Sequence, residues 1–372
     1  MSVLSCARIG NDFASFLEQE FIMDAQLEVV LGVDTHLNVD VGVVIDTVGR
    51  VLGTLSVPTN SEGYNQLLSW TRSFGCLRRA GVEGTGTYGS GLARLLTTNG
   101  IAVFEVNRPN RARRRLRGKS DPTDAENAAR AVLAGEATAL PKSQSGVVEA
   151  LRVLAVTRRS AVKARTQAIN QLRSLLVSAP DDVRAKLLKT SPDECVAKCR
   201  RIRLLGNSPV FVALSQALRT LAKRWTSLSC EIKSLDRTLK QLTEHVAVRL
   251  LQQFGIGTQT AATLMVTAGD NPERLHSEAA FAALCGASPL QASSGKTVRH
   301  RLNRGGDRAA NNALWTIAMV RMRSEERTSA YVARRTAEGM SHKEIQCCLK
   351  RYIAREIYLL LLADLHDASL PS

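Results

Sequence analysis

The chain has 372 residues, and its 50 lysines and arginines outnumber its 34 aspartates and glutamates, which gives a formal net charge of +16. Apolar residues make up 44% of the sequence, so a wholly disordered chain is excluded, and the length indicates two or three domains. The positive charge favours a polyanionic partner, above all nucleic acid, whereas 4% aromatic residues argue against broad base-stacking platforms.

Cysteine usage and the terminal segments bear on location. Eight cysteines are too few for a disulfide scaffold, and they include no C-x-x-C pair, so structural zinc is not expected. Reduced thiols indicate a cytosolic protein. Residues 1–26 form a predicted N-terminal tail without the apolar core of a signal peptide. The apolar run Ile357–Ala363 is far shorter than the roughly 20 residues of a membrane span, so no membrane association is expected.

Residues 27–140 have the pattern of an α/β domain. Three β-branched apolar runs come first, and helical and strand patterns then alternate, which indicates a mixed sheet that begins with an antiparallel hairpin. The predicted strands are Leu27–Val33, Val39–Ile45, Val51–Val57, Arg79–Glu83 and Ile101–Val106. The predicted helices are Ser61–Phe74 and Gly91–Thr98.

A strongly basic segment follows the last of these strands. Residues 108–119 contain no acid and seven positive charges, at Arg108, Arg111, Arg113, Arg114, Arg115, Arg117 and Lys119. Such a segment gives salt-dependent, sequence-neutral affinity for nucleic-acid phosphates. The alternative is a merely solvated basic loop. Asp121 then begins a predicted helix that runs to about Leu133, and a linker is expected over residues 135–146.

Residues 141–245 are predicted to form a helical connector. Its second long helix carries apolar residues alternately four and three positions apart over four heptads. These residues are Leu214, Leu218, Leu221, Trp225, Leu228, Ile232, Leu235, Leu239 and Leu242. We favour a coiled-coil arm that joins protomers. The other interpretation is a helix packed inside a helical bundle.

Residues 246–330 are predicted to form a mainly helical unit with two polar motifs, and residues 331–372 add C-terminal helices. Gly255 and Gly257 lie in a motif shaped like a helix-hairpin-helix turn, whose backbone N–H groups can contact a DNA phosphate. An ordinary glycine-rich turn is the alternative. A serine-containing loop follows at residues 286–296. Candidate phosphate contacts there are Lys296, Arg299, Arg301 and Arg304.

Four acids are candidates for a metal site. Asp34 and Glu83 end predicted strands, and Asp121 and Asp124 lie three residues apart, on one face of a helix. A helix across the sheet edge would bring the four carboxylates together, and Mg²⁺, which prefers oxygen ligands, would relieve their repulsion. Two such ions can stabilise both oxygens that exchange in phosphoryl transfer. Taken singly, Asp121 followed by Pro122 is also an ordinary helix start, with Asp121 as N-cap, and Asp34 an ordinary turn acid.

Together these motifs resemble the DEDD transposases of bacterial insertion sequences, the family numbered one hundred and ten, which includes Piv-type invertases and bridge-RNA-guided recombinases. In the N-terminal part the resemblance rests on Gly-Val-Asp34-Thr-His, Gly-Val-Glu83-Gly-Thr-Gly and Lys-Ser-Asp121-Pro-Thr-Asp124-Ala. In the C-terminal part it rests on Phe254-Gly-Ile-Gly-Thr-Gln-Thr-Ala, Gly286-Ala-Ser-Pro, Ser294-Gly-Lys and Asn303-Arg-Gly-Gly. The motifs span roughly residues 28–330.

The resemblance implies a RuvC-like, RNase H-type α/β domain, a helical coiled-coil connector and a mainly α C-terminal domain. It implies a DNA transposase or site-specific recombinase in which Ser294, or its neighbour Ser293, attacks the scissile phosphate. Mg²⁺ is implied at Asp34, Glu83, Asp121 and Asp124. The implied partners are DNA of the element ends and target, a guide RNA encoded by the element, and further copies of the chain, as a dimer or tetramer. The implied location is the bacterial cytoplasm, at the nucleoid.

Other functions fit parts of the sequence. A junction-resolving nuclease needs the acids and a metal but uses water as nucleophile, so Ser294 would be dispensable. An actin-fold ATPase or sugar kinase fits the glycines near Asp34 and Glu83 but leaves the basic charge unexplained. A non-catalytic DNA-binding protein would not need four intact acids. Asn311 departs from the family pattern, because arginine is expected there, and this weakens the case for DNA contact at that position.

Overall fold

The structure is a computed structural model, and it describes residues 27–106, 120–144, 146–203, 205–295, 300–301, 303 and 305–369. Its internal contacts divide the chain into two units, Met1–Ser143 and Gln144–Ser372. Several predicted features lie outside the described residues, namely the tail 1–26, the basic segment 108–119, and Lys296, Arg299 and Arg304.

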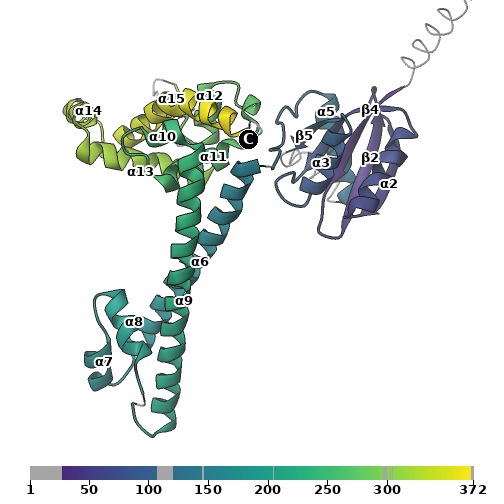
Figure 1. Cartoon of the computed structure of the whole chain (residues 1–372). Helices are drawn as coiled ribbons and strands as arrows, with labels where there is room; N and C mark the ends of the chain where they lie inside the picture. Colours follow the sequence, from purple (N-terminus) through teal and green to yellow (C-terminus); the bar gives the residue numbers. More distant parts are fainter. Residues whose placement is uncertain are drawn as a thin grey trace, which may run out of the picture. The chain divides into compact units, whose positions relative to one another are not determined.

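The first unit is an α/β domain built on a five-stranded mixed sheet (Figure 1). The strand order is β3-β2-β1-β4-β5. The hairpin strands β2 (Val39–Asp46) and β3 (Val51–Pro58) are antiparallel to their neighbours, whereas β1 (Glu28–Asp34), β4 (Cys76–Glu83) and β5 (Ala102–Val106) are parallel to one another. The prediction of a mixed sheet that begins with an antiparallel hairpin is confirmed.

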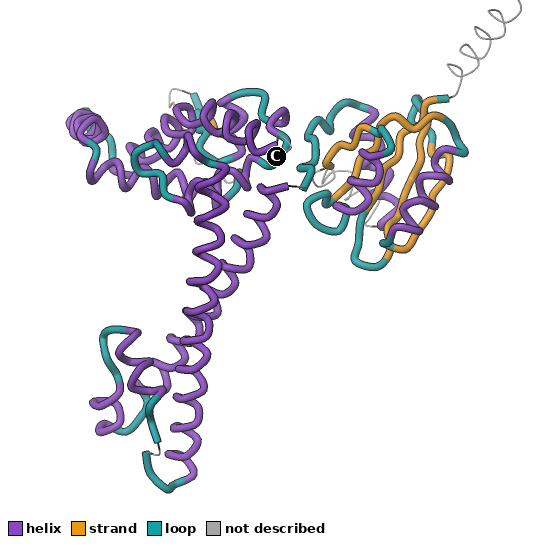
Figure 2. The backbone as a smooth tube through the Cα atoms, in the orientation of Figure 1, coloured by secondary structure: helices purple, strands orange, loops and turns teal. Residues whose placement is uncertain are grey.

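Helices cover both faces of this sheet (Figure 2). On one face, α2 (Ser61–Arg72) and α3 (Ser90–Thr98) pack through leucines and Tyr64. On the other face, α5 (Asp121–Leu133) packs through alanines and Val132. Two separate apolar cores therefore lie on the two sides of the sheet.

The alternation of side chains along β1 places Asp34 on the α5 side. Val29, Leu31 and Val33 belong to the core under α2 and α3, whereas Val30 belongs to the core under α5. Successive side chains of a strand point to opposite faces, so Asp34 shares the face of Val30.

Glycines on two neighbouring strands allow α5 to lie close to the sheet. A Cβ on Gly32 would lie 2.1 Å from the carbonyl oxygen of Ala125, and one on Gly81 would lie 2.6 Å from that of Ala128. Gly32 and Gly81 are register partners across β1 and β4. Glu83 follows Gly81 by two residues and therefore ends β4 on the same face, beside the end of β1.

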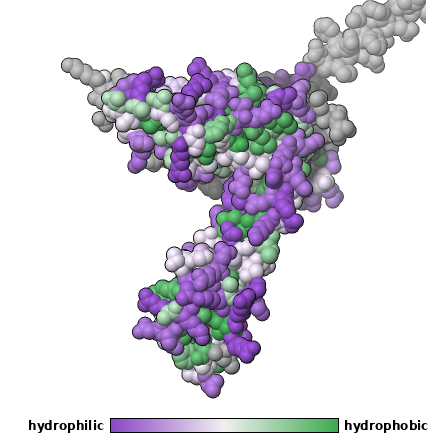
Figure 3. All heavy atoms as spheres, turned by 60° about the vertical axis from the view of Figure 1, so that its left-hand side comes forward, coloured by the Kyte–Doolittle hydropathy of each residue, from purple (hydrophilic) through white to green (hydrophobic). Residues whose placement is uncertain are grey.

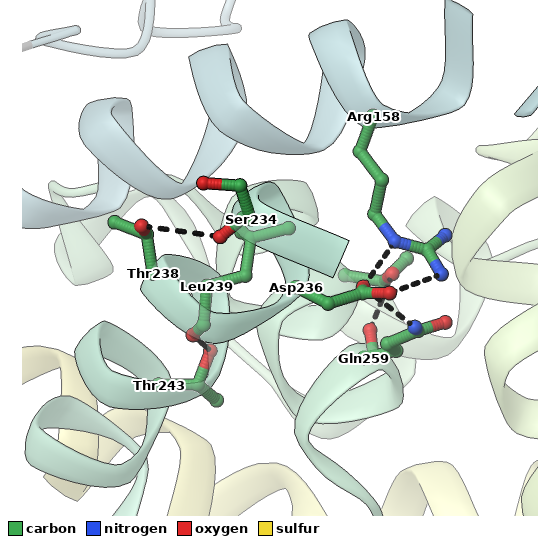
Figure 4. A network of polar contacts seen from close by, with 8 residues as sticks. Arg158, Ser234, Asp236, Thr238, Leu239, Thr243 and Gln259 are labelled. Atoms are coloured by element: carbon green, nitrogen blue, oxygen red, sulfur yellow. Dashed lines mark hydrogen bonds and ion pairs between the residues drawn. The ribbon is translucent and has the colours of Figure 1, made fainter. Parts of the chain in front are cut away.

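The second unit contains two long helices, α6 (Gly146–Val177) and α9 (Pro209–Val246), which pack side by side (Figure 1). The short helices α7 (Asp181–Leu187) and α8 (Pro192–Arg200) pack at one end of this pair, in a core with Leu172 and others. Arg158 of α6 and Gln259 both donate hydrogen bonds to the Asp236 carboxylate of α9 and tie the other end together (Figure 4).

The predicted heptad stripe lies on α9. Its residues Leu218, Ile232 and Leu239 are buried, and the other six are partly buried. The pairing of α9 with α6 supplies a partner for this stripe within one chain. The oligomeric arm stays a prediction.

In the described remainder of this unit, the regular structure is helical apart from one short strand pair. The helices are α10 (Val248–Leu251), α11 (Thr258–Ala268), the 3-10 turn η1 (Pro272–Arg274), α12 (Glu278–Leu284), α13 (Arg308–Ser324), α14 (Glu326–Ala337) and α15 (His342–Ser369). One core joins most of them, and Phe281 is its largest fully buried side chain. Among the residues that the structure describes, none of the helices combines the length and apolarity that crossing a membrane demands.

Candidate active site

The ends of β1 and β4 are fixed to each other by the residue that follows Asp34. The Thr35 hydroxyl donates a hydrogen bond of 2.7 Å to the carbonyl oxygen of Glu83. Gly84 then adopts a φ of +67°, a left-handed conformation that favours glycine, and the chain leaves the sheet. Both predicted strand-end acids thus stand at one edge of the sheet.

A buried carboxylate holds the turn after β1. Asp40, at the start of β2, is 0% exposed, and its Oδ1 accepts hydrogen bonds from the His36 backbone N–H at 3.0 Å and from the Thr59 hydroxyl at 3.2 Å. Burial raises the pKa of Asp40, and these two hydrogen bonds partly oppose that shift. The anchored turn directs His36 past the end of β1.

Asp121 and Asp124 occupy the first turn of α5. Ser120 is the N-cap, and Asp121 is the first helical residue, so the alternative of Asp121 as a plain N-cap is wrong. Pro122 follows at the start of the helix, where its missing N–H costs nothing. Asp124 is 3% exposed. Acids in the first turn interact favourably with the helix dipole, which lowers the cost of placing two carboxylates here.

The structure places Asp34 and Asp121 in one cluster with His36, and Glu83 and Asp124 lie near enough to affect the charge of Asp34. Asp34 is 7% exposed, and its pKa is raised from 3.8 to about 6. Burial is the largest cause, His36 opposes it, and the negative charges of Glu83, Asp124 and Asp121 raise the pKa further. A buried carboxyl group at the edge of a sheet, with the negative charges of other acids acting on it, is an electrostatic setting that a divalent cation stabilises.

His36 is a member of this cluster that the sequence analysis left without a role. Its Nδ1 lies 4.0 Å from Asp34 Oδ2, and its Nε2 lies 3.9 Å from Asp121 Oδ1. The donor atoms of these three residues all lie within 4.8 Å of one another. The sequence feature that could have identified His36 is its position two residues after Asp34, the acid at the end of the strand.

The donor set fits a divalent metal ion. Carboxylate oxygens are the ligands that Mg²⁺ and Mn²⁺ prefer, and the imidazole nitrogen of His36 is a donor better suited to Mn²⁺ than to Mg²⁺. Asp34, Asp121 and His36 are the residues placed to hold such an ion first, with Glu83 and Asp124 close enough to Asp34 to raise its pKa.

The predicted serine loop is clamped at its base. Gly286 has a φ of +64°, and a Cβ on Gly306 would lie 2.2 Å from the Gly286 nitrogen, so the two ends of the loop meet backbone to backbone. The short strands β6 (Leu290–Gln291) and β7 (His300–Arg301) pair above this clamp. Ser294 is exposed beyond them. The loop therefore presents its serine to solvent from an ordered base.

Asn311 completes the clamp through its side-chain amide. Its side-chain nitrogen donates to the carbonyl oxygens of Cys285 at 2.9 Å and Gly286 at 3.0 Å, and its oxygen accepts a hydrogen bond from Lys350 Nζ at 3.1 Å. Lys350 is 6% exposed. The position at which the family pattern leads one to expect arginine is thus a structural one in this chain.

Of the other predicted phosphate contacts, three are described. Gly255 has a φ of +82° and forms the tight turn before α11. The N–H of Gly257 donates to the Thr260 hydroxyl at 3.0 Å, so it is engaged inside the turn. Arg301 is exposed on β7. Contact with DNA at these residues stays a prediction.

Two family models match the chain. Residues 31–179 match the IS110 DEDD model, described as "Transposase", and residues 247–333 match the model described as "Transposase IS116/IS110/IS902 family". The chain belongs to the IS110 family of transposases. The first match contains the four acids, and the second contains Gly255 and Ser294.

Two curated relatives agree with this membership. The IS110 uncharacterized 43.6 kDa protein of Streptomyces coelicolor is 29% identical over 153 residues, which are 40% of this chain and 36% of that protein. The transposase for insertion sequence element IS1328 of Yersinia enterocolitica is 28% identical over 218 residues, which are 56% of this chain and 61% of that protein. The matched part is less than two thirds of either relative.

Proposed function

We propose that this IS110-family protein is a DNA transposase that cuts and rejoins DNA at the ends of an insertion sequence and at a target. The observation that carries the proposal is the clustering of Asp34 with Asp121 and His36, near Glu83 and Asp124. Burial above all, and the charges of the other three acids after it, raise the pKa of Asp34 to about 6. In a chain with a formal net charge of +16, such a cluster fits metal-assisted chemistry on a phosphodiester better than a purely structural role.

The proposed fold of the first unit is RNase H-like, of the RuvC type. Support comes from the strand order β3-β2-β1-β4-β5, with acids at the ends of β1 and β4 and on a helix packed against both. Mg²⁺ is the proposed ion, and when bound it supplies Lewis-acid stabilisation of the reacting phosphate. The acids of this chain hold the ion, and Thr35 and Asp40 keep the strand ends in place.

Ser294 is the proposed nucleophile, with Ser293 as its neighbour in the same exposed loop. Its Oγ forms a bond to phosphorus, and the bond between that phosphorus and one DNA oxygen breaks. The serine hydroxyl loses its proton, and the released DNA oxygen gains one. The result is a phosphoserine ester and a free DNA hydroxyl. Lys296, Arg299, Arg301 and Arg304 are the proposed phosphate contacts beside it.

The remaining proposals concern partners. A guide RNA and DNA are the proposed nucleic acids, with the segment 108–119 as an electrostatic contact. A dimer or tetramer is the proposed assembly, with the α6–α9 pair as a coiled-coil connector. The proposed location is the bacterial cytoplasm, at the nucleoid.

The proposal is tested by trapping the protein on DNA. Purified protein is mixed with Mg²⁺, labelled DNA that carries the element junction, and the flanking RNA transcripts. Denaturing gels and mass spectrometry then locate any covalent DNA–peptide adduct. We expect an adduct at Ser294 that Ser294→Ala abolishes, that Ser293→Ala retains, and that Asp34→Ala and Asp124→Asn reduce by at least about a hundredfold.

Each other outcome contradicts a defined part of the proposal. An adduct lost in Ser293→Ala but kept in Ser294→Ala moves the nucleophile by one residue. Cleaved ends without an adduct indicate a nuclease that uses water. Full activity of Asp34→Ala or Asp124→Asn removes the metal-site assignment.

A further inference from the structure

A groove in the second unit is lined by no residue of the acid cluster or of the serine loop. It has a volume of about 980 Å³ and runs between the C-terminal end of α13, α14, the middle of α15 and the turn before α11. Figure 3 turns the α14 side of the unit forward and shows hydrophilic side chains interspersed with apolar ones there. The volume is in the upper range for sites that hold small molecules or parts of polymers.

The groove is lined by an ion pair between the buried Arg321 and Glu356, whose side chain is 41% exposed. Arg321 is 6% exposed, and its guanidinium forms two hydrogen bonds with the Glu356 carboxylate, of 2.9 and 2.8 Å. Its Nε donates to the carbonyl oxygen of Phe254 at 2.9 Å. A planar guanidinium fixed by three hydrogen bonds holds α13, α15 and the glycine turn together, so the groove is built on a rigid base.

Two tyrosines form one wall. The rings of Tyr331 and Tyr352 meet edge to face, with centroids 5.8 Å apart and an interplanar angle of 89°. Tyr352 is 52% exposed, so much of its ring is open to a ligand. The guanidinium carbon of Arg334 lies 5.5 Å from the Tyr331 centroid. Ring surface and positive charge are therefore available at the same place.

The charge of the groove is positive. Arg327, Arg334 and Arg355 line it and are exposed. Its two acids are already engaged, because Glu356 pairs with Arg321 and Glu325 accepts a hydrogen bond from the Thr328 hydroxyl. A cationic ligand is disfavoured here, and an anion that also carries a flat ring is favoured.

We propose that this groove binds an unpaired nucleotide of a nucleic-acid strand, with the base against Tyr331 and Tyr352 and the phosphate contacted by the arginines. Aromatic side chains interleaved with arginine are the usual means of holding single strands, because every base has a π-face and every linkage a phosphate. A base inside a duplex is stacked on its neighbours and cannot reach the tyrosines. The inference rests on the proposed function only in taking nucleic acid as the partner of this protein.

Binding of short labelled strands to the full-length protein tests this site. Single-stranded DNA and RNA of about ten nucleotides, and the matching duplex, are titrated in the presence of EDTA at a salt concentration that suppresses nonspecific phosphate contacts. We expect single strands to bind more tightly than the duplex. Tyr352→Ala weakens single-strand binding by roughly tenfold or more, and Tyr352→Phe keeps it. Comparison of the affinities for single-stranded DNA and single-stranded RNA shows which of the two nucleic acids supplies the nucleotide.

A matched control removes an aromatic side chain elsewhere in the same unit. Trp315 of α13 is 43% exposed and does not line the groove, so Trp315→Ala leaves the affinity for single strands unchanged. Strands with 5-iodouracil, after irradiation and digestion, yield a crosslinked peptide that contains Tyr331 or Tyr352. Equal binding by wild type and Tyr352→Ala, or equal affinity for duplex and single strand, overturns the proposal.

The proposal for the groove and the proposed function can be refuted independently of each other. Unchanged binding by Tyr352→Ala together with a DNA adduct at Ser294 refutes the groove alone. A tyrosine-dependent affinity without any metal-dependent cleavage refutes the proposed function alone.

Discussion

At the residue scale, the fold holds the carboxylates of the site close to one another and partly buried, where their negative charges are unfavourable. The sequence was enough to select Asp34, Glu83, Asp121 and Asp124, because strand ends and the i, i+3 spacing are visible in it. His36 and Asp40 were not selected, since a side chain in a turn gains its role from what the turn faces. His36 contributes a nitrogen that lies 3.9 Å from Asp121, and Asp40 anchors the turn that carries His36. Both contributions depend on contacts that form only in the folded protein.

The charge of Asp34 makes the metal-free protein less stable as pH rises. The pKa of Asp34 is about 6 in the folded state and 3.8 in the unfolded chain, so the stability that Asp34 provides below pH 3.8 is lost as pH rises through about 6. A shift of this size corresponds to at most about 3 kcal/mol at pH 7. We therefore expect Asp34→Asn to stabilise the first unit in EDTA by up to that amount and to flatten this part of its pH profile.

Trp70 provides the measurement, because it is the one tryptophan of Met1–Ser143. In a background with Trp225→Phe and Trp315→Phe, urea unfolding followed by fluorescence reports on the α/β unit at a series of pH values. Equal stability of Asp34→Asn and its parent at pH 7 would contradict the assignment of Asp34 as an ionised carboxylate that destabilises the folded protein.

Divalent cations should reverse this instability. A ligand at a hundred times its Kd stabilises a folded protein by about 2.7 kcal/mol, so Mg²⁺ or Mn²⁺ raises the unfolding midpoint of the Trp70 reporter, and Asp34→Asn loses most of that response. His36→Ala separates the two ions. Because imidazole is a better donor to Mn²⁺ than to Mg²⁺, we expect its Mn²⁺ response to fall more than its Mg²⁺ response. An unchanged Mn²⁺ response would exclude His36 as a ligand.

At the element scale, the sequence predicted which segments are strands more reliably than how the helices pair. The five strands and α2, α3 and α5 appear where apolar periodicity placed them, although β4 begins at Cys76 and not at Arg79. The short pair β6–β7 was missed, because two-residue strands inside a polar loop carry no periodic signal. The heptad stripe on α9 indicated a helical partner but carried no information on whether α6 or a second chain provides it.

The close approach of α5 to the sheet is the element-scale feature that assembles the acids, and Gly32→Ala tests it. The added Cβ meets a backbone oxygen at 2.1 Å, so the helix itself must move. We expect a loss of about 1–3 kcal/mol in the Trp70 unfolding assay, typical of overpacking, and a reduced stabilisation by Mg²⁺. A variant that keeps both wild-type stability and the full Mg²⁺ response would show that α5 does not position Asp121 and Asp124 through this contact.

At the scale of the whole molecule, the excess of basic residues should govern DNA affinity. Each phosphate neutralised by a side chain contributes about 0.9 to the slope of log K against log salt. Replacing Arg113, Arg114 and Arg115 with alanine should therefore lower that slope by up to about three and weaken binding to all duplex sequences alike. The change is read from titrations over a range of salt concentrations. A matched variant, Arg159→Ala, Arg201→Ala and Arg237→Ala, removes the same charge from exposed positions of the second unit that lie outside the groove and the serine loop. If both triple variants change the slope equally, the segment 108–119 acts only through net charge and is no distinct DNA contact.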